Sequence, residues 1–245
     1  VKVHSYSLTQ EGKLPEDADM IYILGPQFDY TEKEIQLLET YLEEGGKMIL
    51  AFNDYMDGEN YRNLKNFSAQ YGISVEDQIL KDPTRNYSGD EETLIPEYTA
   101  HEIVEKLNTD QIATIIPRAR RLSIEEKEDI TTEIVLQTSE EAPIAVTAEK
   151  DLENDKKMQL FIIGNAFFAH DQVIGLGGNS EIFFGVLKWL REDSSIVDIP
   201  PKTYTPEPII FIGSQPVLIF IVSVLLIPLF VFLFGGMIYF RRRSL

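Results

Sequence analysis

The sequence predicts an α/β domain with a mostly parallel sheet and flanking helices, joined to one C-terminal transmembrane helix. Short apolar runs, such as MIYIL at residues 20–24 and MQLFIIG at residues 158–164, are typical of parallel strands covered on both faces. Segments with apolar residues at helical spacing lie between such runs, which is the alternation that α/β folds show. A long uncharged apolar stretch at residues 216–240 predicts the membrane helix.

The first helix and its two neighbouring strands form a predicted βαβ unit. Thr31 and Glu34 have the spacing of a capping box, in which each side chain satisfies a backbone donor at a helix start. The helix should bury residues at three- to four-residue spacing and end at Gly45 and Gly46. The run KMILAF at residues 47–52 then supplies the second strand, so the crossover should be right-handed.

The middle of the chain alternates less regularly. A second helix is expected at residues 60–71, and residues 101–107 should form one or two helical turns. Further strands are expected at residues 2–7, 74–80, 112–116, 132–138 and 143–148. Residues 81–100 are polar and irregular, and are predicted to be a long functional or mobile loop.

A glycine-rich loop at residues 175–178 follows the last buried strand and leads to an amphipathic helix, with Asn179 as its expected N-cap. The loop could bind an anion at the helix N-terminus, but a structural turn is the favoured interpretation. Four prolines between residues 193 and 208 then favour an extended stalk. The expected units are an extracytoplasmic domain (1–192), a stalk (193–215), a membrane helix (216–240) and a cytoplasmic tail (241–245).

Basic residues at one end of the apolar stretch predict its orientation. Arg241, Arg242 and Arg243 follow it directly, and the positive-inside rule places them in the cytoplasm, with the large domain outside the cell membrane. Export of such a domain needs a leader, so the natural protein is expected to continue upstream with a hydrophobic segment. Within the span, Pro228 should kink the helix.

Gly235 and Gly236 give the predicted membrane helix a smooth face, suited to packing against another membrane protein. Together with Pro228, they are the residues expected to contact a partner within the membrane. The alternative is that these residues are merely tolerated there, as is common in membrane helices.

Composition excludes several classes of function. The chain has 22 basic and 40 acidic residues and a formal net charge of −18, which becomes −21 without the three tail arginines. Nucleic acid is therefore not an expected partner, because a phosphate-binding surface needs clustered Lys and Arg. The chain contains no cysteine, which excludes disulfides, thiol nucleophiles and cysteine metal sites.

Candidate chemical groups follow the buried strands, because open α/β sheets bind ligands at the carboxyl ends of their strands. These weak candidates are Asn53, Asp54, Asn165, His170 and Asp171. The sequence NDYMDGEN at residues 53–60 could supply oxygen ligands to a hard cation, but its spacing does not match a calcium loop. No catalytic residue, cofactor or metal site is therefore predicted.

One basic cluster lies outside the membrane flank. It consists of Arg118, Arg120 and Arg121. In so acidic a chain these arginines could pair with its own carboxylates or with those of a partner, and internal pairing is the favoured interpretation.

Several phrases in a fixed order resemble one known family. They are GPQFDYTEKEIQLLETYLEEGGKMILAF, NLKNFSAQYGISVEDQILKDPTRN, PEYTAHEIVEKL, IIGNAFFAHD and GGNSEIFFGVLKWL, followed by the stalk, the membrane helix and the arginine-rich end. Across nearly its whole length the chain is similar to the GldG-like, gliding-motility-associated auxiliary proteins of ABC transporters. The resemblance implies a flavodoxin-like or class I glutamine-amidotransferase-like domain without that enzyme's catalytic residues. It also implies association with an ABC-2-type permease and a cytoplasmic ATPase.

The leading hypothesis is therefore a non-enzymatic subunit of an ABC transporter complex. Family members carry an N-terminal membrane helix and more external sequence, in keeping with the expected upstream segment. One alternative is a membrane-anchored hydrolase or amidotransferase relative that uses His170, Asp171 or Asp54. Another is a glycan- or peptide-binding module, for which exposed aromatic residues would have to cluster on one edge. The candidates for that cluster are Tyr55, Tyr61, Tyr87 and Tyr98.

Overall fold

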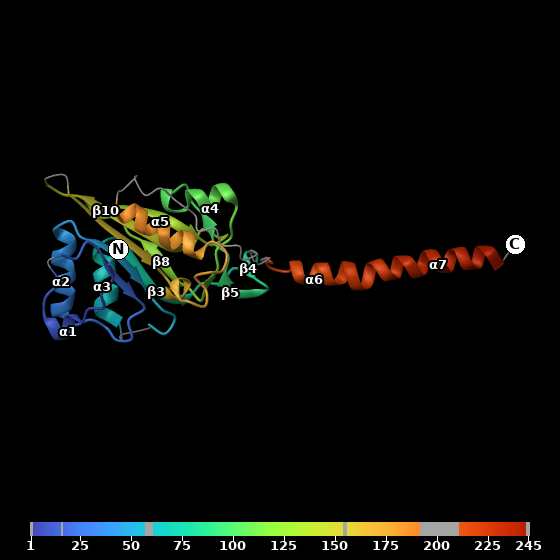
Figure 1. The fold of residues 1–245 in the computed structure, drawn as a ribbon, viewed down its shortest axis with the longest axis horizontal. Coiled ribbons are helices and arrows are strands. Elements are labelled where there is room, and N and C mark those ends of the chain that lie inside the picture. Colours follow the sequence, from blue (N-terminus) through green and yellow to red (C-terminus); the bar gives the residue numbers. More distant parts are fainter. Residues whose placement is uncertain (1, 16, 57–60, 154–155, 192–210, 244–245) are drawn as a thin grey trace.

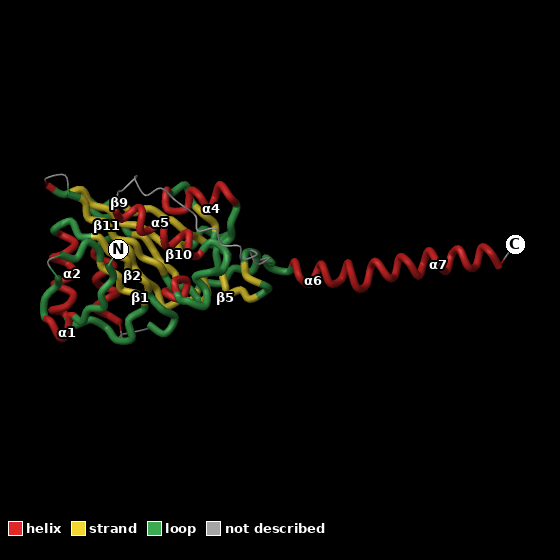
Figure 2. Tube along the Cα trace, in the orientation of Figure 1, coloured by secondary structure: helices red, strands yellow, loops and turns green. Residues whose placement is uncertain are grey.

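The computed structural model describes residues 2–15, 17–56, 61–153, 156–191 and 211–243. A six-stranded sheet forms its centre, in the order β1, β2, β11, β10, β9, β6 (Figures 1 and 2). Their bounds are β1 Ile21–Leu24, β2 Lys47–Ala51, β11 Lys157–Ile163, β10 Pro143–Asp151, β9 Thr131–Gln137 and β6 Glu97–Tyr98. β1, β2 and β11 pair in parallel, and β9 shares their direction because it pairs antiparallel to β10. The predicted α/β class is confirmed.

Two layers cover the sheet, one on each face (Figure 1). One layer holds α2 Glu32–Glu43, α3 Arg62–Gln70 and a two-stranded ribbon of β3 Ile73–Ile79 and β8 Arg120–Ile124. The other holds η2 Glu102–Val104, α4 Glu105–Asp110 and α5 Asn179–Arg191. Successive side chains of β2 point to opposite faces of the sheet. Met48 and Leu50 pack in the core beneath α2 and α3, and Ile49 and Ala51 pack in the core beneath α4 and α5.

The predicted capping box begins α2. Thr31 Oγ1 accepts a hydrogen bond from the Glu34 N–H (3.3 Å), and Glu34 Oε2 accepts one from the Thr31 N–H (2.8 Å). Gly45, at φ 92°, then lets the chain turn from the helix into β2. The parallel pairing of β1 with β2 completes the predicted βαβ unit.

The strands predicted at residues 2–7 and 112–116 were wrong, because neither segment pairs along its length with a described strand. Residues 2–6 are exposed, and residues 2–7 pair with no described strand. They lead into a short helix, α1 Leu8–Glu11. Only Ile116 of the predicted strand 112–116 belongs to a strand, β7 Ile116–Pro117. In residues 112–115, backbone groups that could pair with a neighbouring strand form hydrogen bonds with side chains instead. Tyr98 binds the Ile112 carbonyl, and Asn179 binds the N–H and carbonyl of Ile115.

The predicted loop at residues 81–100 is ordered instead. It contains β4 Asn86–Tyr87, β5 Asp90–Leu94 and β6. β4, β5 and β7 form a small three-stranded sheet, which we call the hairpin sheet. The sequence did not predict these strands because they are short and rich in turn residues, so the hydrophobic pattern shows neither a helical period nor a strand alternation there.

One long helix ends the described chain and extends away from the domain (Figure 1). It comprises α6 Gln215–Phe220, a π-helical segment Ile221–Leu226 and α7 Ile227–Arg243. Its 25 residues from Gln215 to Tyr239 are long and apolar enough to cross a membrane, and none of this span is buried against the domain. The π-helical segment ends two residues before Pro228, and its wider turns make room for the proline ring. Most of the predicted stalk, at residues 193–210, lies outside the described residues.

Candidate functional site

The carboxyl ends of the parallel strands, where ligands were expected, are closed by the protein's own groups. Asn53 follows β2, and its Nδ2 donates to the Tyr55 hydroxyl (2.7 Å), which donates in turn to the Gly25 carbonyl after β1 (2.9 Å). Gly25 has a φ of 60°, and a Cβ atom there would lie 2.0 Å from Asn53 Nδ2. The Asn53 side chain therefore packs directly against the Gly25 backbone, and its amide nitrogen is bonded within the protein.

Arg120 fills the space behind this edge. Its side chain is 1% exposed, which is rare for arginine. The guanidinium donates to the carbonyls of Asn53 (2.8 Å), Asp54 (2.6 Å) and Asp77 (3.0 Å). A planar group with five donors can hold several carbonyls at once, so Arg120 joins the end of β2 to β3.

Arg118 joins the same edge to the hairpin sheet. Its Nε donates to Asp54 Oδ2 (2.6 Å), and its guanidinium also pairs with Glu92 of β5. Asn165, after β11, donates through Nδ2 to the Arg118 carbonyl (3.1 Å). The hydrogen bond to Asp54 and the charge of Glu92 raise the pKa of Arg118. The internal pairing expected for the arginine cluster is thus confirmed at this residue.

The remaining edge candidates do not converge on these groups. His170 lies in an exposed turn, where its ring stacks on Phe167 at 4.9 Å and its Nδ1 accepts from the Gln172 N–H (3.3 Å). Asp171 is exposed beside it. Asp54 is held by Arg118, so the structure does not unite these three residues in a pocket.

The metal hypothesis rested on residues 53–60, of which residues 57–60 lie outside the described part. Asn53 and Asp54 are engaged as above. Within the described ranges, no group of three or more His, Asp or Glu side chains could hold a metal ion.

Asn179 does not cap α5, contrary to expectation. Its Oδ1 accepts from the Ile115 N–H (2.8 Å) and its Nδ2 donates to the Ile115 carbonyl (2.9 Å). The Gly178 N–H before it is bound to the Ala113 carbonyl (2.9 Å). The glycine-rich loop therefore acts as a structural turn, since its last amide and the asparagine side chain bind residues 113–115.

The hairpin sheet is ordered by a buried carboxylate, Asp82. One of its oxygens accepts from the Thr84 N–H (2.9 Å) and the Arg85 N–H (2.8 Å), and the other from the Ser139 N–H (2.8 Å). Burial opposes the charge, but these hydrogen bonds outweigh it and hold the pKa of Asp82 well below its usual range. Asn86 Nδ2 adds a bond to the Asp82 carbonyl (2.8 Å).

The segment before the membrane helix pairs with this sheet. Ile212 forms an antiparallel bridge with Tyr87 of β4. Two backbone hydrogen bonds flank the bridge, from the Ser88 N–H to the Phe211 carbonyl (3.2 Å) and from the Gly213 N–H to the Asn86 carbonyl (2.8 Å). We call this pairing the junction. The segment before the membrane helix is thereby joined to the domain by one isolated antiparallel bridge with two backbone hydrogen bonds, in addition to the covalent connection.

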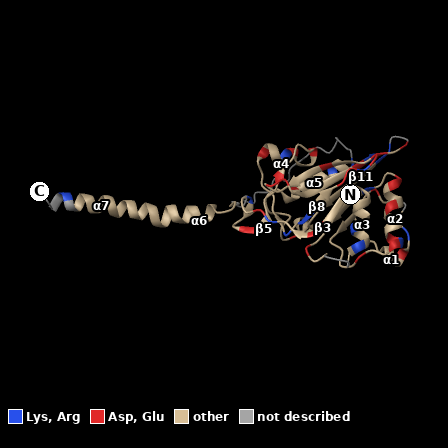
Figure 3. Ribbon diagram, turned by 180° about the vertical axis from the view of Figure 1, so that it is seen from behind, with Lys and Arg blue, Asp and Glu red and all other residues tan. Residues whose placement is uncertain are grey.

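The surface near the junction is acidic. Figure 3 shows acidic residues on β5, next to the start of the membrane helix, and basic residues at the far end of that helix. Asp90 and Glu91 are exposed on β5, beside the junction. The negative charge of these side chains disfavours close contact with anionic lipid headgroups.

None of the membrane helix from Gln215 to Tyr239 is buried against the rest of the described chain. A Cβ atom at Gly235 or Gly236 would meet no atom within 4 Å. The polar group of Ser223 is satisfied within the helix, by a hydrogen bond from Oγ to the Ile219 carbonyl (2.6 Å). The candidate residues Pro228, Gly235 and Gly236 are thus all placed on an uncovered helix.

The four tyrosines considered for glycan or peptide binding do not form one cluster. Tyr61 is 4% exposed and donates to the Gln27 carbonyl (2.6 Å), and Tyr98 donates inward to the Ile112 carbonyl (2.6 Å). Tyr55 lies on the strand edge and Tyr87 in the junction. The proposed aromatic patch is therefore not present among these residues.

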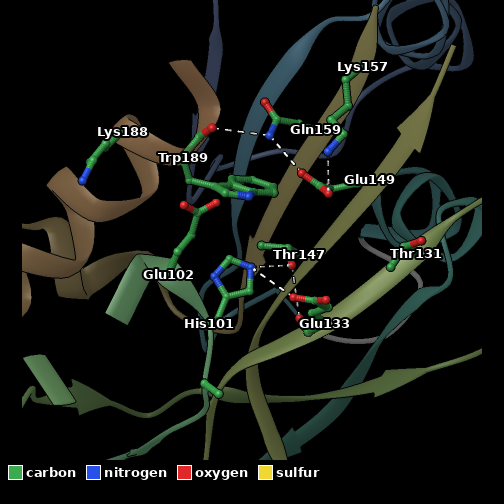
Figure 4. A pocket seen from close by; sticks show the side chains of 11 residues that line it. His101, Glu102, Thr131, Glu133, Thr147, Glu149, Lys157, Gln159, Lys188 and Trp189 are labelled. Carbon is green, nitrogen blue, oxygen red and sulfur yellow. Dashed lines mark hydrogen bonds and ion pairs between the residues drawn. The ribbon is translucent and has the colours of Figure 1, made fainter. Parts of the chain in front are cut away.

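A pocket of about 580 Å³ lies elsewhere, on the sheet face that α5 covers only in part (Figure 4). It is lined by Ala100, His101, Glu102, Thr131, Glu133, Thr147, Glu149, Lys157, Gln159, Lys188 and Trp189. The pocket was not predicted from the sequence, because its lining residues are spread over residues 100–189. They become neighbours only when β9, β10 and β11 pair. Polar residues at alternate positions of those strands were the available signal.

His101 is the buried centre of this pocket. Its Nδ1 accepts from the Ile103 N–H (3.2 Å) and so caps η2, which leaves Nε2 near Thr147 Oγ1 (3.3 Å) and Glu133 Oε2 (3.6 Å). Burial lowers the pKa of His101, and the charge of Glu133 only partly opposes this. The imidazole is therefore neutral at neutral pH and engaged through both nitrogens.

Comparison with known proteins gives a likeness of fold. No family model matches the sequence, and no curated protein sequence matches it. Among solved structures, the mmIFT52 N-terminal domain is similar with a TM-score of 0.58 and 21% sequence identity, over 72% of this chain and 78% of that chain. At this identity the likeness concerns the α/β fold and not the activity.

Proposed function

We propose that this chain is a non-enzymatic auxiliary subunit of an ABC transporter complex. Its α/β domain would lie outside the cell membrane, and its helix would pack against an ABC-2-type permease. ATP hydrolysis is assigned to a separate cytoplasmic subunit. The family resemblance of the sequence suggests this class of partner, and Arg241–Arg243 support a cytoplasmic C-terminal end.

The junction is the observation that carries the proposal. Strand pairing of residues 211–213 with β4 gives a membrane helix and an external domain a fixed connection. From β4, Asp82 continues the connection to Ser139 between β9 and β10, and Arg118 continues it from β5 to Asp54. A movement of the permease that displaces the helix would therefore move the domain with it.

Purification from native membranes tests the proposal. The tagged full-length protein, extracted in a mild detergent, is expected to bring down a permease and an ATPase. Substituting Gly235→Leu and Gly236→Leu should abolish this recovery, because the leucines hold the two helices apart. Met237→Leu, on another side of the helix, is the matched control and should leave recovery unchanged.

Recovery of the full-length protein without a permease or an ATPase would overturn the proposal. Recovery that survives both glycine substitutions would keep the partner class but move its contact away from this face. Membrane insertion of each variant is checked by alkaline extraction, so that loss of the span is not mistaken for loss of the partner.

A further inference from the structure

The membrane helix begins within one turn of the junction. The Gln215 N–H donates to the Ile212 carbonyl (3.2 Å), and the Ile212 N–H donates to Gln215 Oε1 (3.1 Å). Gly213, at φ 55°, supplies the left-handed backbone conformation of this turn. Because the two ends of a β-turn lie less than about 7 Å apart, Ile212 is held close to the first residue of the helix.

The turn between β4 and β5 is held at the same place. We call residues 87–90 the hairpin tip. Tyr87 pairs with Ile212, with Cα atoms about 4.5 Å apart as in a non-hydrogen-bonded antiparallel pair, and the Ser88 N–H donates to the Phe211 carbonyl (3.2 Å). The Cα atom of Tyr87 therefore lies within about 12 Å of the first helical residue. Figure 3 shows β5, which begins in the hairpin tip, next to the start of the helix.

The length of the helix places its start relative to a bilayer. Its 25 residues from Gln215 to Tyr239 cover about 37 Å at about 1.5 Å per residue. This length exceeds the hydrocarbon thickness of about 30 Å, so both ends reach into the headgroup layers, which add about 5–7 Å on each side. The hairpin tip is therefore at the level of the headgroups or directly above them.

The residues of the hairpin tip suit a membrane interface. Tyr87 is 37% exposed and combines an apolar ring with a polar hydroxyl, the combination that enriches tyrosine at such interfaces. Ser88 and Gly89 are exposed, and a Cβ atom at Gly89 would meet no atom within 4 Å. Asp90 and Glu91 are exposed and acidic, which disfavours anionic headgroups. Zwitterionic headgroups carry no net charge and present an ammonium group to such carboxylates.

We propose that the hairpin tip contacts the headgroup layer of the membrane that the helix crosses, with zwitterionic lipids as its partner and Tyr87 as the aromatic residue at the interface. The domain is then held at two points, the helix and the hairpin tip, which keeps it from rotating freely about the helix axis. The proposal requires the helix to span a membrane. It does not depend on the ABC transporter partner, because lipid alone provides the contact.

Fluorescence quenching by lipid tests the contact. Because the chain contains no cysteine, Ser88→Cys gives the full-length protein one site for a fluorescent label. The labelled protein is reconstituted in phosphatidylcholine vesicles that carry a nitroxide on the headgroups of both leaflets, so its orientation does not matter. The label at Ser88→Cys should lose most of its emission. Gln36→Cys is the matched control, exposed on α2 at the end of the domain opposite the helix (Figure 1), and should keep its emission.

Two further measurements test the aromatic residue and the lipid class. Tyr87→Ser leaves the backbone bridge in place but removes the ring, so the emission loss at Ser88→Cys should become smaller. Replacing half of the phosphatidylcholine by phosphatidylglycerol should also reduce this loss, because each carboxylate near an anionic surface shifts the contact equilibrium by about fivefold. Glu91→Gln should recover part of this second effect.

Equal emission loss at Ser88→Cys and Gln36→Cys would overturn the proposal. A nitroxide in the middle of the acyl chains that quenches the Ser88→Cys label more than the headgroup nitroxide would overturn the headgroup placement. An unchanged emission loss with Tyr87→Ser would overturn the role of the ring, and a larger loss in the anionic vesicles would overturn the choice of lipid. Alkaline extraction of each preparation shows that the helix is inserted, so failed insertion is not mistaken for a missing contact.

Discussion

Asp82 is the residue on which the hairpin sheet depends. It lies in a stretch that looks like loop in the sequence, yet its carboxylate binds backbone N–H groups both of its own turn and of Ser139. Hydrogen bonds to a charged acceptor are worth about 1.5–3 kcal/mol each, more than neutral ones. The ionised side chain of Asp82 therefore adds to the strand pairing of β4, β5 and β6 in ordering residues 81–98.

Replacing Asp82→Asn should lower the free energy of unfolding by about 2–3 kcal/mol, because the amide loses the charge and turns a donor toward N–H groups. Urea unfolding of the full-length protein in detergent, followed by circular dichroism, measures the change. Asp17→Asn, an exposed substitution, serves as control. A loss as small as that of the control would show that the network contributes little.

His101 links stability to pH. Its folded pKa is lowered from 6.5, so below that pH the unfolded chain takes up a proton that the folded chain resists. Its contribution is fully present above pH 6.5 and is lost as the pH falls through the folded pKa. The variant His101→Asn keeps the cap of η2, as Asn165 caps the turn after β11, but does not titrate.

Stability of the wild type should fall more steeply than that of His101→Asn as the pH is lowered below 6.5. Urea midpoints at several pH values measure the two slopes. Parallel slopes would mean that His101 titrates alike in the folded and unfolded states.

At the scale of elements, the junction is the contact that the sequence did not reveal. The hydrogen bonds that flank Tyr87 and Ile212 make them a non-hydrogen-bonded antiparallel pair, in which Cα atoms lie about 4.5 Å apart. This spacing suits a disulfide. Because the chain has no cysteine, a crosslink can be introduced without competing thiols.

The double variant Tyr87→Cys and Ile212→Cys should therefore form a disulfide in isolated membranes under mild oxidation. A shift in gel mobility that a reductant reverses detects it. Glu105→Cys with Ile212→Cys is the control pair and should stay reduced. Equal yields from the two pairs would mean that residues 211–213 do not hold the position described.

The membrane helix is the second element whose sequence and structure differ. A kink was predicted at Pro228. The structure has a π-helical segment, Ile221–Leu226, that ends two residues before this proline. π-Helical turns are often found at functional sites, because they shift the faces of the two flanking helices relative to one another. Gly235 and Gly236 beyond it are therefore rotated away from the position that a continuous α-helix would give them.

For the whole molecule, the proposed orientation follows from charge. All 40 acidic residues and 19 of the 22 basic residues precede the arginine tail, whereas the far end of the helix carries Arg241–Arg243 and no acidic residue (Figure 3). A membrane separates these two regions by the length of the span, about 30 Å of hydrocarbon.

A single cysteine at Ser5→Cys, in the exposed N-terminal segment, should react in whole cells with a maleimide that cannot cross the membrane. Labelling should not increase when the membrane is made permeable. Protection in whole cells, followed by labelling after permeabilisation, would reverse the orientation and with it the external placement of the domain.

The sequence by itself determined the features that depend on local period and length: the α/β class, the βαβ unit with its capping box at Thr31 and Glu34, and a helix able to cross a membrane. The tertiary structure decided which polar residues meet. It turned Arg120 inward at the edge where Asn53 and Asp54 were expected to bind ligands. It also paired residues 211–213 with β4 and brought His101 beside Trp189. Hydrophobic periodicity repeats along one segment, whereas these contacts join residues far apart in the chain, so no local pattern records them.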